Sequence, residues 1–221
     1  LRRQRQMCIR DRQNIHPVWE ALADKNTRVV AQIAPAVRVA VGDKFGIKKG
    51  DNSIEKLVAA LRLMGFDEVY DTNFGADLTV MEESKELMEK LEEGKDLPLF
   101  TSCCPAWVKF CEEKYPELRK HISSCRSPQQ MFGAMSKTYI AQKLGIDPSI
   151  VFSISIMPCV AKKYERSVPQ VNDSGRGSDV DLVLTTRELE SFIRSDSIKP
   201  EDLTDVPFDS IFGEGSGAGV I

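Results

Sequence analysis

Two cysteine-containing segments hold the residues best suited to chemistry. They are residues 101–107 (TSCCPAW) and 157–165 (MPCVAKKYE), and each places cysteine beside proline at the start of an expected helix. Backbone N–H groups and the helix dipole favour a thiolate at such a position, and the thiolate is the form that binds metal. The two segments therefore indicate a metal–sulfur cluster rather than a structural disulfide.

Cys103 and Cys104 are adjacent, so we expect them to differ in role. Neighbouring side chains diverge, and a bridge between adjacent cysteines strains the backbone, which argues against shared ligation of one iron. One thiolate is expected to bind metal, and the other is free to move protons. From the residues alone, two small buried hydrophobic side chains remain an alternative, and we expect Cys111 and Cys125 in the core.

Two further sets of side chains could assist such a site. Lys162 lies one turn after Cys159 and could direct its ammonium at an anionic cofactor group, although a solvated surface lysine is the alternative. Glu83 and Glu86 are three residues apart on an expected helix and share a face. A proton relay needs carboxylates and a hydroxyl within hydrogen-bond reach, whereas solvated helix charge is the alternative.

The elements that must position these residues alternate along the chain. Short apolar, β-branched runs predict strands, and apolar residues at helical spacing predict helices. This alternation predicts an α/β fold of parallel βαβ units, in which ligands lie at the carboxyl ends of the strands. The expected strands are 28–34, 68–70, 98–101, 151–157 and 181–185, and the expected helices are 54–64, 76–91, 105–114, 127–144 and 186–194.

Composition excludes several classes of function. The chain has 221 residues, a formal net charge of -3 and a pI near 5.6, so charge gives no case for nucleic acid or anionic membrane as a partner. No apolar run approaches the roughly 20 residues that span a bilayer. Six cysteines in a chain of this length, without paired C-x-x-C, favour reduced thiols and a cytoplasmic location.

Both ends of the chain differ from the rest. Residues 1–13 are basic and lack the apolar core of a secretory signal, so we expect a non-native leader, with a partner-binding tail as the alternative. The other end finishes at Ile221, after the small-residue segment 213–219, and is expected to be cut off. The expected domain is therefore 14–221.

The two cysteine segments resemble the first and second of three signature motifs of [FeFe]-hydrogenases. The similarity extends from about residue 14 to the last residue and includes 34–40 (APAVRVA) and 127–130 (SPQQ). The resemblance implies the two-lobed iron-hydrogenase catalytic fold, incomplete at the C-terminus. The third motif, a Cys-x-x-x-Cys stretch, is absent from this sequence.

The resemblance also implies a cofactor, the H-cluster, which joins a [4Fe-4S] cubane to a diiron subcluster carrying CO, cyanide and a bridging dithiolate amine. Cys104 and Cys159 match two of the four cysteines that hold the cubane. Lys162 would hold a cyanide, and Ala36 stands where some members carry serine. The residues that match the lining of the diiron pocket are Pro35, Ala36, Pro128, Gln129, Met157 and Lys162.

By the same resemblance, Cys103 exchanges protons with the bridging amine, and the route continues through Glu83, Ser123 and Glu86 to solvent. Lys90 stands where the family often has arginine at the end of this route. The implied reaction is 2H⁺ + 2e⁻ ⇌ H₂ in the full-length parent, with a ferredoxin-type electron carrier and maturation proteins as partners. The 221-residue chain alone is expected to be inactive.

Two other functions remain open from the sequence. The first is a non-catalytic member of the superfamily, either an iron–sulfur assembly factor or a hydrogen or redox sensor. Such relatives commonly lack the relay thiol, which is Cys103 here. The second is a simple zinc or iron–sulfur module, in which Cys104 and Cys159 would be joined by Cys111 or Cys125.

Overall fold

The computed structural model describes residues 14–48 and 53–210. The expectations for the leader 1–13 and for the segment 213–219 lie outside the described residues. In chain order the elements are α2 (Ile15–Ala23), β1 (Arg28–Ile33), α3 (Pro35–Phe45), α4 (Ser53–Leu63), β2 (Glu68–Asp71), α5 (Asn73–Glu93), α6 (Pro105–Lys114), η1 (Pro116–His121), α7 (Pro128–Met135), η2 (Ser136–Ile140), α8 (Ala141–Leu144), η3 (Pro148–Ile150), β3 (Val151–Met157), α9 (Ala161–Arg166), η4 (Pro169–Val171), β4 (Leu182–Thr185), α10 (Thr186–Ser195) and η5 (Pro200–Asp202).

The four strands form one sheet in the order β2-β1-β3-β4, and every neighbouring pair is parallel. This confirms the predicted α/β class and the four strands expected near 28–34, 68–70, 151–157 and 181–185. In the central pair, Ile33 lies opposite Ile156, so β1 and β3 end at the same edge. The segments that follow these two strands therefore start side by side.

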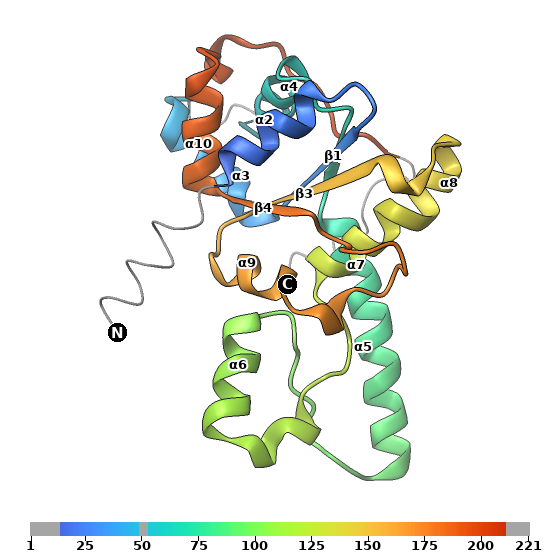
Figure 1. Cartoon of the computed structure of the whole chain (residues 1–221). Helices are drawn as coiled ribbons and strands as arrows, with labels where there is room; N and C mark the ends of the chain where they lie inside the picture. Colours follow the sequence, from blue (N-terminus) through green and yellow to red (C-terminus); the bar gives the residue numbers. More distant parts are fainter. Residues whose placement is uncertain (1–13, 49–52, 211–221) are drawn as a thin grey trace.

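Alternate residues of β1 face two separate cores, as expected for a strand covered on both sides. Val29, Ala31 and Ile33 face the larger core, which α2, α3, α4 and α10 cover. Val30 faces a smaller core, which includes Phe132 from α7 and residues of η2 and α8. The α/β lobe at the top of Figure 1 is therefore a sheet between two layers of helices.

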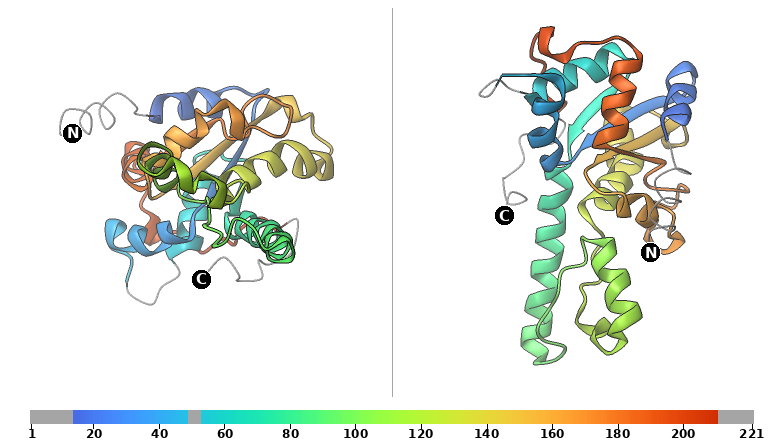
Figure 2. Two further views of the ribbon diagram at one scale, coloured as in Figure 1. Left: turned by 90° about the horizontal axis from the view of Figure 1, so that it is seen from below. Right: turned by 90° about the vertical axis from the view of Figure 1, so that its left-hand side faces the viewer.

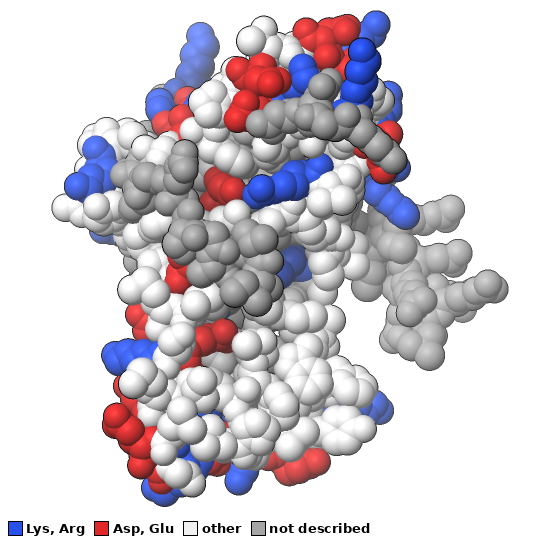
Figure 3. Space-filling model, turned by 180° about the vertical axis from the view of Figure 1, so that it is seen from behind, with Lys and Arg blue, Asp and Glu red and all other residues white. Residues whose placement is uncertain are grey.

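A second lobe projects from the carboxyl edge of the sheet. The 21-residue helix α5 starts beside the sheet and runs to the far end of this lobe, where α6 and η1 lie beside it (Figures 1 and 2). Seen from behind, much of this lobe is uncharged, with charged side chains along its edges (Figure 3). Exposed apolar side chains on α5 and α6 include Met81, Met88, Leu91 and Phe110.

The structure corrects several expectations. The strand expected at 98–101 is not part of the sheet, because only Phe100 pairs there, through a single bridge to Ile122. The helix expected at 127–144 is three consecutive helical segments, with a π-helical turn at Ser136–Ile140. Helices α2 and α3 were not predicted, whereas α9 is the helix expected to start in the second cysteine segment. In the described ranges, we find no helix with the length and apolar character needed to cross a membrane.

Candidate active site

The first cysteine segment lies on a loop that enters α6. Cys104 is the N-cap residue of that helix and Pro105 its first residue, as the sequence predicted. Cys103 and Cys104 are both exposed free thiols. Their exposure excludes the alternative of two buried hydrophobic residues and leaves both sulfur atoms accessible to a ligand.

The second cysteine segment follows β3 directly. Met157 is the last residue of this strand and is buried, while Cys159 is an exposed free thiol just before α9. From α9, the Lys162 ammonium donates a hydrogen bond to the carbonyl oxygen of Cys103 over 2.6 Å. This contact, between residues 59 apart in sequence, brings the two cysteine segments together.

Lys162 also donates to the carboxylate of Glu165, with Nζ 3.0 Å from Oε2. The same oxygen accepts a hydrogen bond from the amide Nε2 of Gln129 over 3.1 Å. Gln129 is buried, and its Oε1 accepts from the Ser155 hydroxyl of β3 over 2.8 Å. Two residues of the predicted diiron pocket, Lys162 and Gln129, therefore share one carboxylate partner.

The other predicted pocket residues lie at helix starts. Pro35 and exposed Ala36 begin α3, and half-buried Pro128 begins α7. Ala34 donates its backbone N–H to Ile156 over 3.0 Å, so the start of α3 lies at the same sheet edge as Met157. The structure thus places both prolines, Ala36 and Met157 at or beside the carboxyl edge of the sheet.

The predicted proton route is assembled in two separate pieces. Ser123 donates its hydroxyl to Glu86 Oε2 over 2.9 Å, which joins two of its residues directly. Glu83 lies nearer the first cysteine segment, where its Oε1 accepts the backbone N–H of Ser102 over 3.4 Å. Within residues 14–48 and 53–210, no hydrogen bond links Glu83 to Ser123 or to the Cys103 thiol.

Glu86 is held as a carboxylate by its surroundings. Partial burial by itself would raise its pKa, but hydrogen bonds from the Ser123 hydroxyl and the Ser124 N–H, together with nearby Lys90, outweigh burial and lower the pKa. The Lys90 ammonium lies 3.3 Å from Glu86 Oε1 and also donates to the carbonyl of Lys120 over 3.1 Å. Lys90 thus contacts Glu86, the last carboxylate of the predicted route.

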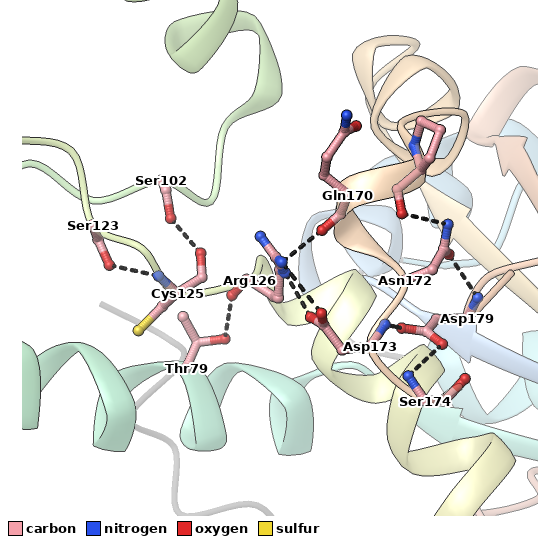
Figure 4. Close-up of polar contacts among 11 residues, drawn as sticks. Thr79, Ser102, Ser123, Cys125, Arg126, Gln170, Asn172, Asp173, Ser174 and Asp179 are labelled. Atoms are coloured by element: carbon pink, nitrogen blue, oxygen red, sulfur yellow. Dashed lines mark hydrogen bonds and ion pairs between the residues drawn. The ribbon is translucent and has the colours of Figure 1, made fainter. Parts of the chain in front are cut away.

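Hydrogen bonds join residues 123–126 to Ser102, Gln170 and Asp173 (Figure 4). Ser102 donates its hydroxyl to the carbonyl of Cys125 over 2.6 Å, and the Cys125 N–H donates to the Ser123 hydroxyl over 3.1 Å. Arg126 extends to the other side, where Nε lies 2.6 Å from Asp173 Oδ2 and Nη2 donates to the Gln170 carbonyl over 2.6 Å. These contacts connect the first cysteine segment to the loop that follows α9.

Cys111 and Cys125 differ from each other, although the sequence predicted both in the core. Cys111 is fully buried, which confirms the prediction. Cys125 is half-buried, and its sulfur lies 3.8 Å from Glu86 Oε2, so the prediction is wrong for this residue. Burial is the main reason that the pKa of the Cys125 thiol is raised.

A pocket of about 670 Å³ opens between the second lobe and α9. Its wall combines hydroxyl, thiol, charged and apolar groups. It includes Glu165 and the unpaired hydroxyl of buried Ser127. The residues that line it are Ser102, Pro105, Val108, Lys109, Glu112, Arg119, Ile122, Ser123, Ser124, Cys125, Arg126, Ser127, Tyr164, Glu165, Val168, Gln170 and Val171.

The thiols present fit part of a cubane's ligand set. Cys104 and Cys159 are accessible and come from segments that Lys162 joins, so both suit iron. In the described part of the chain, however, no three or more Cys, His, Asp or Glu side chains are grouped to hold a metal ion. The simple four-ligand module is disfavoured because Cys111 is enclosed in the core and Cys125 faces Glu86.

The structure brings to the site several residues whose part in it no sequence pattern predicts. Glu165 was part of the second segment, and its spacing of three from Lys162 on one helix was a readable signal. Ser102 and Arg126 contribute through contacts distant in sequence, and Cys125, expected in the core or as an alternative ligand, does so beside Glu86. No pattern in the neighbouring sequence predicts such contacts.

Comparisons with known proteins identify similar chains. The sequence is 43% identical to iron hydrogenase 1 of Clostridium pasteurianum over 214 residues, which are 97% of this chain and 37% of that protein. It is 46% identical to the periplasmic [Fe] hydrogenase large subunit of Nitratidesulfovibrio vulgaris, covering 92% of this chain and 49% of that one. The chain thus spans less than half the length of these relatives.

Structural comparison agrees with the sequence comparison. The [FeFe]-hydrogenase HydA1 of Chlamydomonas reinhardtii matches with a TM-score of 0.83 at 41% identity, over 94% of this chain and 53% of that one. More distant relatives have another role, since the cytosolic Fe-S cluster assembly factor narfl of Xenopus tropicalis is 29% identical over 84% of this chain and 40% of its own length.

The match to a whole family covers more of the chain than any single motif. Residues 27–221 match the family described as the iron only hydrogenase large subunit, C-terminal domain. The parallel sheet and the second lobe agree with this match, since hydrogenase structures superpose on them. The chain therefore belongs to the C-terminal domain family of the iron-only hydrogenase large subunit.

Proposed function

We propose that this chain forms part of an iron-hydrogenase catalytic domain that interconverts protons, electrons and H₂. The observation that carries the proposal is the Lys162 contact to Cys103, which joins a candidate proton-exchanging thiol to two candidate iron ligands. Cys104 and Cys159 would hold a [4Fe-4S] cubane, with Pro35, Ala36, Pro128, Gln129, Met157 and Lys162 lining the diiron subcluster. When bound, this H-cluster supplies the redox-active iron that the protein itself lacks.

Lys162 would orient an anionic group of the cofactor. An ammonium has three N–H donors, and two of them are directed at Cys103 and Glu165. The third has no acceptor among the described residues, so it is available for a charge-assisted hydrogen bond. Buried Gln129, which shares the Glu165 carboxylate with Lys162, would limit water at that position.

The thiol of Cys103 would hold the proton next to the cofactor. Behind it, Glu83 contacts the preceding residue, Ser102, and the Ser123–Glu86 pair continues toward the surface. Because no hydrogen bond among the described residues joins the Cys103 thiol to Glu83, proton transfer between them would need a bridging water molecule or a change of side-chain rotamer. Glu86, which its neighbours hold as a carboxylate, would pass protons between Ser123 and solvent.

We also propose the partners and the location of the whole protein. A ferredoxin-type carrier would supply electrons, and maturation proteins would deliver the cofactor. We also propose a cytoplasmic location, although the relatives include a periplasmic hydrogenase subunit as well as cytosolic assembly factors.

An iron–sulfur assembly factor is the second candidate, because such proteins are among the relatives. The hydrogenases are the more similar group, at 43% and 46% identity, compared with 29% and 34% for two of the assembly factors. The Ser123–Glu86 contact also favours catalysis, since an assembly factor has no need of a proton route.

A hybrid protein tests the proposed function. This chain would replace the matching region of the C. pasteurianum relative, and the hybrid would be loaded with cofactor and supplied with reduced electron carrier. We expect H₂ formation from the hybrid, and no stable cubane on the 221-residue chain after reconstitution with iron and sulfide. A cofactor-loaded hybrid that forms no H₂ would support the assembly-factor role, and a full cubane on the chain alone would support a simple iron–sulfur module.

A further inference from the structure

Glu165 is a buried carboxylate to which the proposed function gives no task. Its side chain is 9% exposed and lies on α9, three residues after Lys162. Burying a carboxylate is costly unless it is paired and hydrogen-bonded. Glu165 Oε2 meets this requirement with two donors, the Lys162 ammonium at 3.0 Å and the Gln129 amide at 3.1 Å.

The contacts of Glu165 lead in two directions. Through Gln129 they reach the Ser155 hydroxyl, which belongs to β3 in the sheet. Through Lys162 they reach the carbonyl of Cys103, on the loop before α6. One carboxylate oxygen therefore connects the sheet with the loop that carries Cys103, and Glu165 lies in the wall of the pocket.

We propose that Glu165 is a positioning residue, which fixes Lys162 and Gln129 relative to each other and, through Lys162, holds the Cys103 loop against α9. The importance of this arrangement for H₂ chemistry rests on the proposed function; the arrangement itself does not. Without the carboxylate, the Lys162 ammonium would keep only its carbonyl partner. The Nε2 group of Gln129 would keep only its 3.3 Å contact to the Lys162 carbonyl.

A matched ion pair on the same helix separates positioning from general stability. Lys163 pairs with Glu188, and the exposed fractions of these side chains are 8% and 14%, compared with 14% and 9% for Lys162 and Glu165. Glu188 also completes the capping box at the start of α10. Its removal should lower stability, but none of its side-chain hydrogen bonds to other described residues leads to Cys103.

The experiment compares Glu165→Ala, Glu165→Gln and Glu188→Ala in the 221-residue chain. Lysine acetylation is followed by peptide mass spectrometry, and hydrogen–deuterium exchange is measured over residues 101–106. Thermal melts establish that each variant is folded at the working temperature. Lys162 and Lys163 serve as internal references for each other.

We expect Glu165→Ala to raise the acetylation rate of Lys162 by about tenfold, since a charge-assisted hydrogen bond contributes roughly that factor. Exchange over 101–106 should rise with it, and Lys163 should be unchanged. Glu165→Gln should restore part of the protection, because the amide oxygen still accepts a hydrogen bond. Glu188→Ala should raise the acetylation rate of Lys163 and leave that of Lys162 unchanged. Equal responses of Lys162 in the Glu165 and Glu188 variants, or no response in either, would overturn the proposal.

A second readout concerns the cofactor. Because Lys162 would hold a cyanide of the cofactor, Glu165→Ala should shift an infrared cyanide band of the loaded hybrid, and Glu188→Ala should leave this band unchanged. If the hybrid with the original residues forms no H₂, the proposed function fails while the acetylation result still stands. An unshifted cyanide band in an active hybrid would overturn the positioning role alone.

Discussion

Replacement of Gly75 by alanine directly tests the close packing of α5, which carries Glu83 and Glu86, against α7, which carries Pro128 and Gln129. A Cβ atom added at Gly75 would lie 2.4 Å from the carbonyl oxygen of Pro128 and 3.1 Å from Cβ of Phe132. Contacts of Cβ below 3.0 Å essentially never occur, so the two helices must separate by at least 0.6 Å. Because the contacting atom is backbone, no side-chain rotation can relieve the overlap.

The expected cost follows from two opposing effects. Overpacking of this kind costs about 1–3 kcal/mol. Replacing a helical glycine by alanine stabilises a helix by at most about 1 kcal/mol. Since the overlap involves backbone, we expect Gly75→Ala to lower the free energy of unfolding by about 2 kcal/mol. The shift at Pro128 should also disturb the adjacent Gln129, which contacts Glu165.

Gly42→Ala is the matched control. Gly42 lies inside α3, and a Cβ atom there would meet its nearest neighbour, Ser53, at an ordinary 3.6 Å. We expect this variant to be about 0.5–1 kcal/mol more stable than the original chain. Urea unfolding at pH 7 measures both changes. If Gly75→Ala were as stable as Gly42→Ala, the described packing of α5 on α7 would be wrong.

Three further predictions concern individual contacts. The pKa of Glu86 is lowered in the folded chain, so the ionised carboxylate stabilises the fold above the ordinary pKa of 4.5, and this stabilisation is lost as the pH falls through the folded-state pKa. Glu86→Gln should therefore remove this part of the acid dependence of the urea midpoint, measured from pH 3 to 7. Arg126→Ala should lower the free energy of unfolding by about 1 kcal/mol, because the ion pair with Asp173 is partly exposed, and should increase deuterium uptake over 170–179. Arg126→Lys should give an intermediate loss of stability, because lysine cannot form both contacts to the Asp173 carboxylate. Increased uptake confined to other segments would argue against this role of Arg126. Thr185→Ala should lower the free energy of unfolding by about 1 kcal/mol through loss of the α10 capping box, and an unchanged urea midpoint would contradict the cap.

Three strands of the sheet could be predicted from sequence because β1, β3 and β4 are short runs rich in buried aliphatic residues, whereas β2 offered only the Val69–Tyr70 pair between two acidic residues. Helix α3 was missed because its valines and Gly42 are poor helix formers. Its signal was the spacing of four between the buried residues Val37, Val41 and Phe45. The expected strand at 98–101 failed for a different reason, since its single bridge leaves it without the ladder of partners that defines a strand.

The candidate site was predictable only in part. Motif resemblance named the cysteines, and helical spacing placed Glu83 and Glu86 on one face. The partner of Lys162 across the two segments, the carbonyl of Cys103, depends on how α6 packs against α9. The same holds for the pairing of Ser123 with Glu86, which joins residues 37 apart. Contacts of this kind are decided by tertiary packing rather than by local pattern.

The central claim is that Cys103 moves protons while Cys104 and Cys159 hold iron. The most direct test is the rate of H₂ formation by the cofactor-loaded hybrid carrying Cys103→Ala, with Cys111→Ala as the control for loss of a cysteine outside the site. We predict a loss of at least about 100-fold for Cys103→Ala, the usual scale for a positioned proton donor, with iron content retained and a rate within a few-fold of the original for Cys111→Ala. Undiminished H₂ formation by Cys103→Ala would contradict the claim.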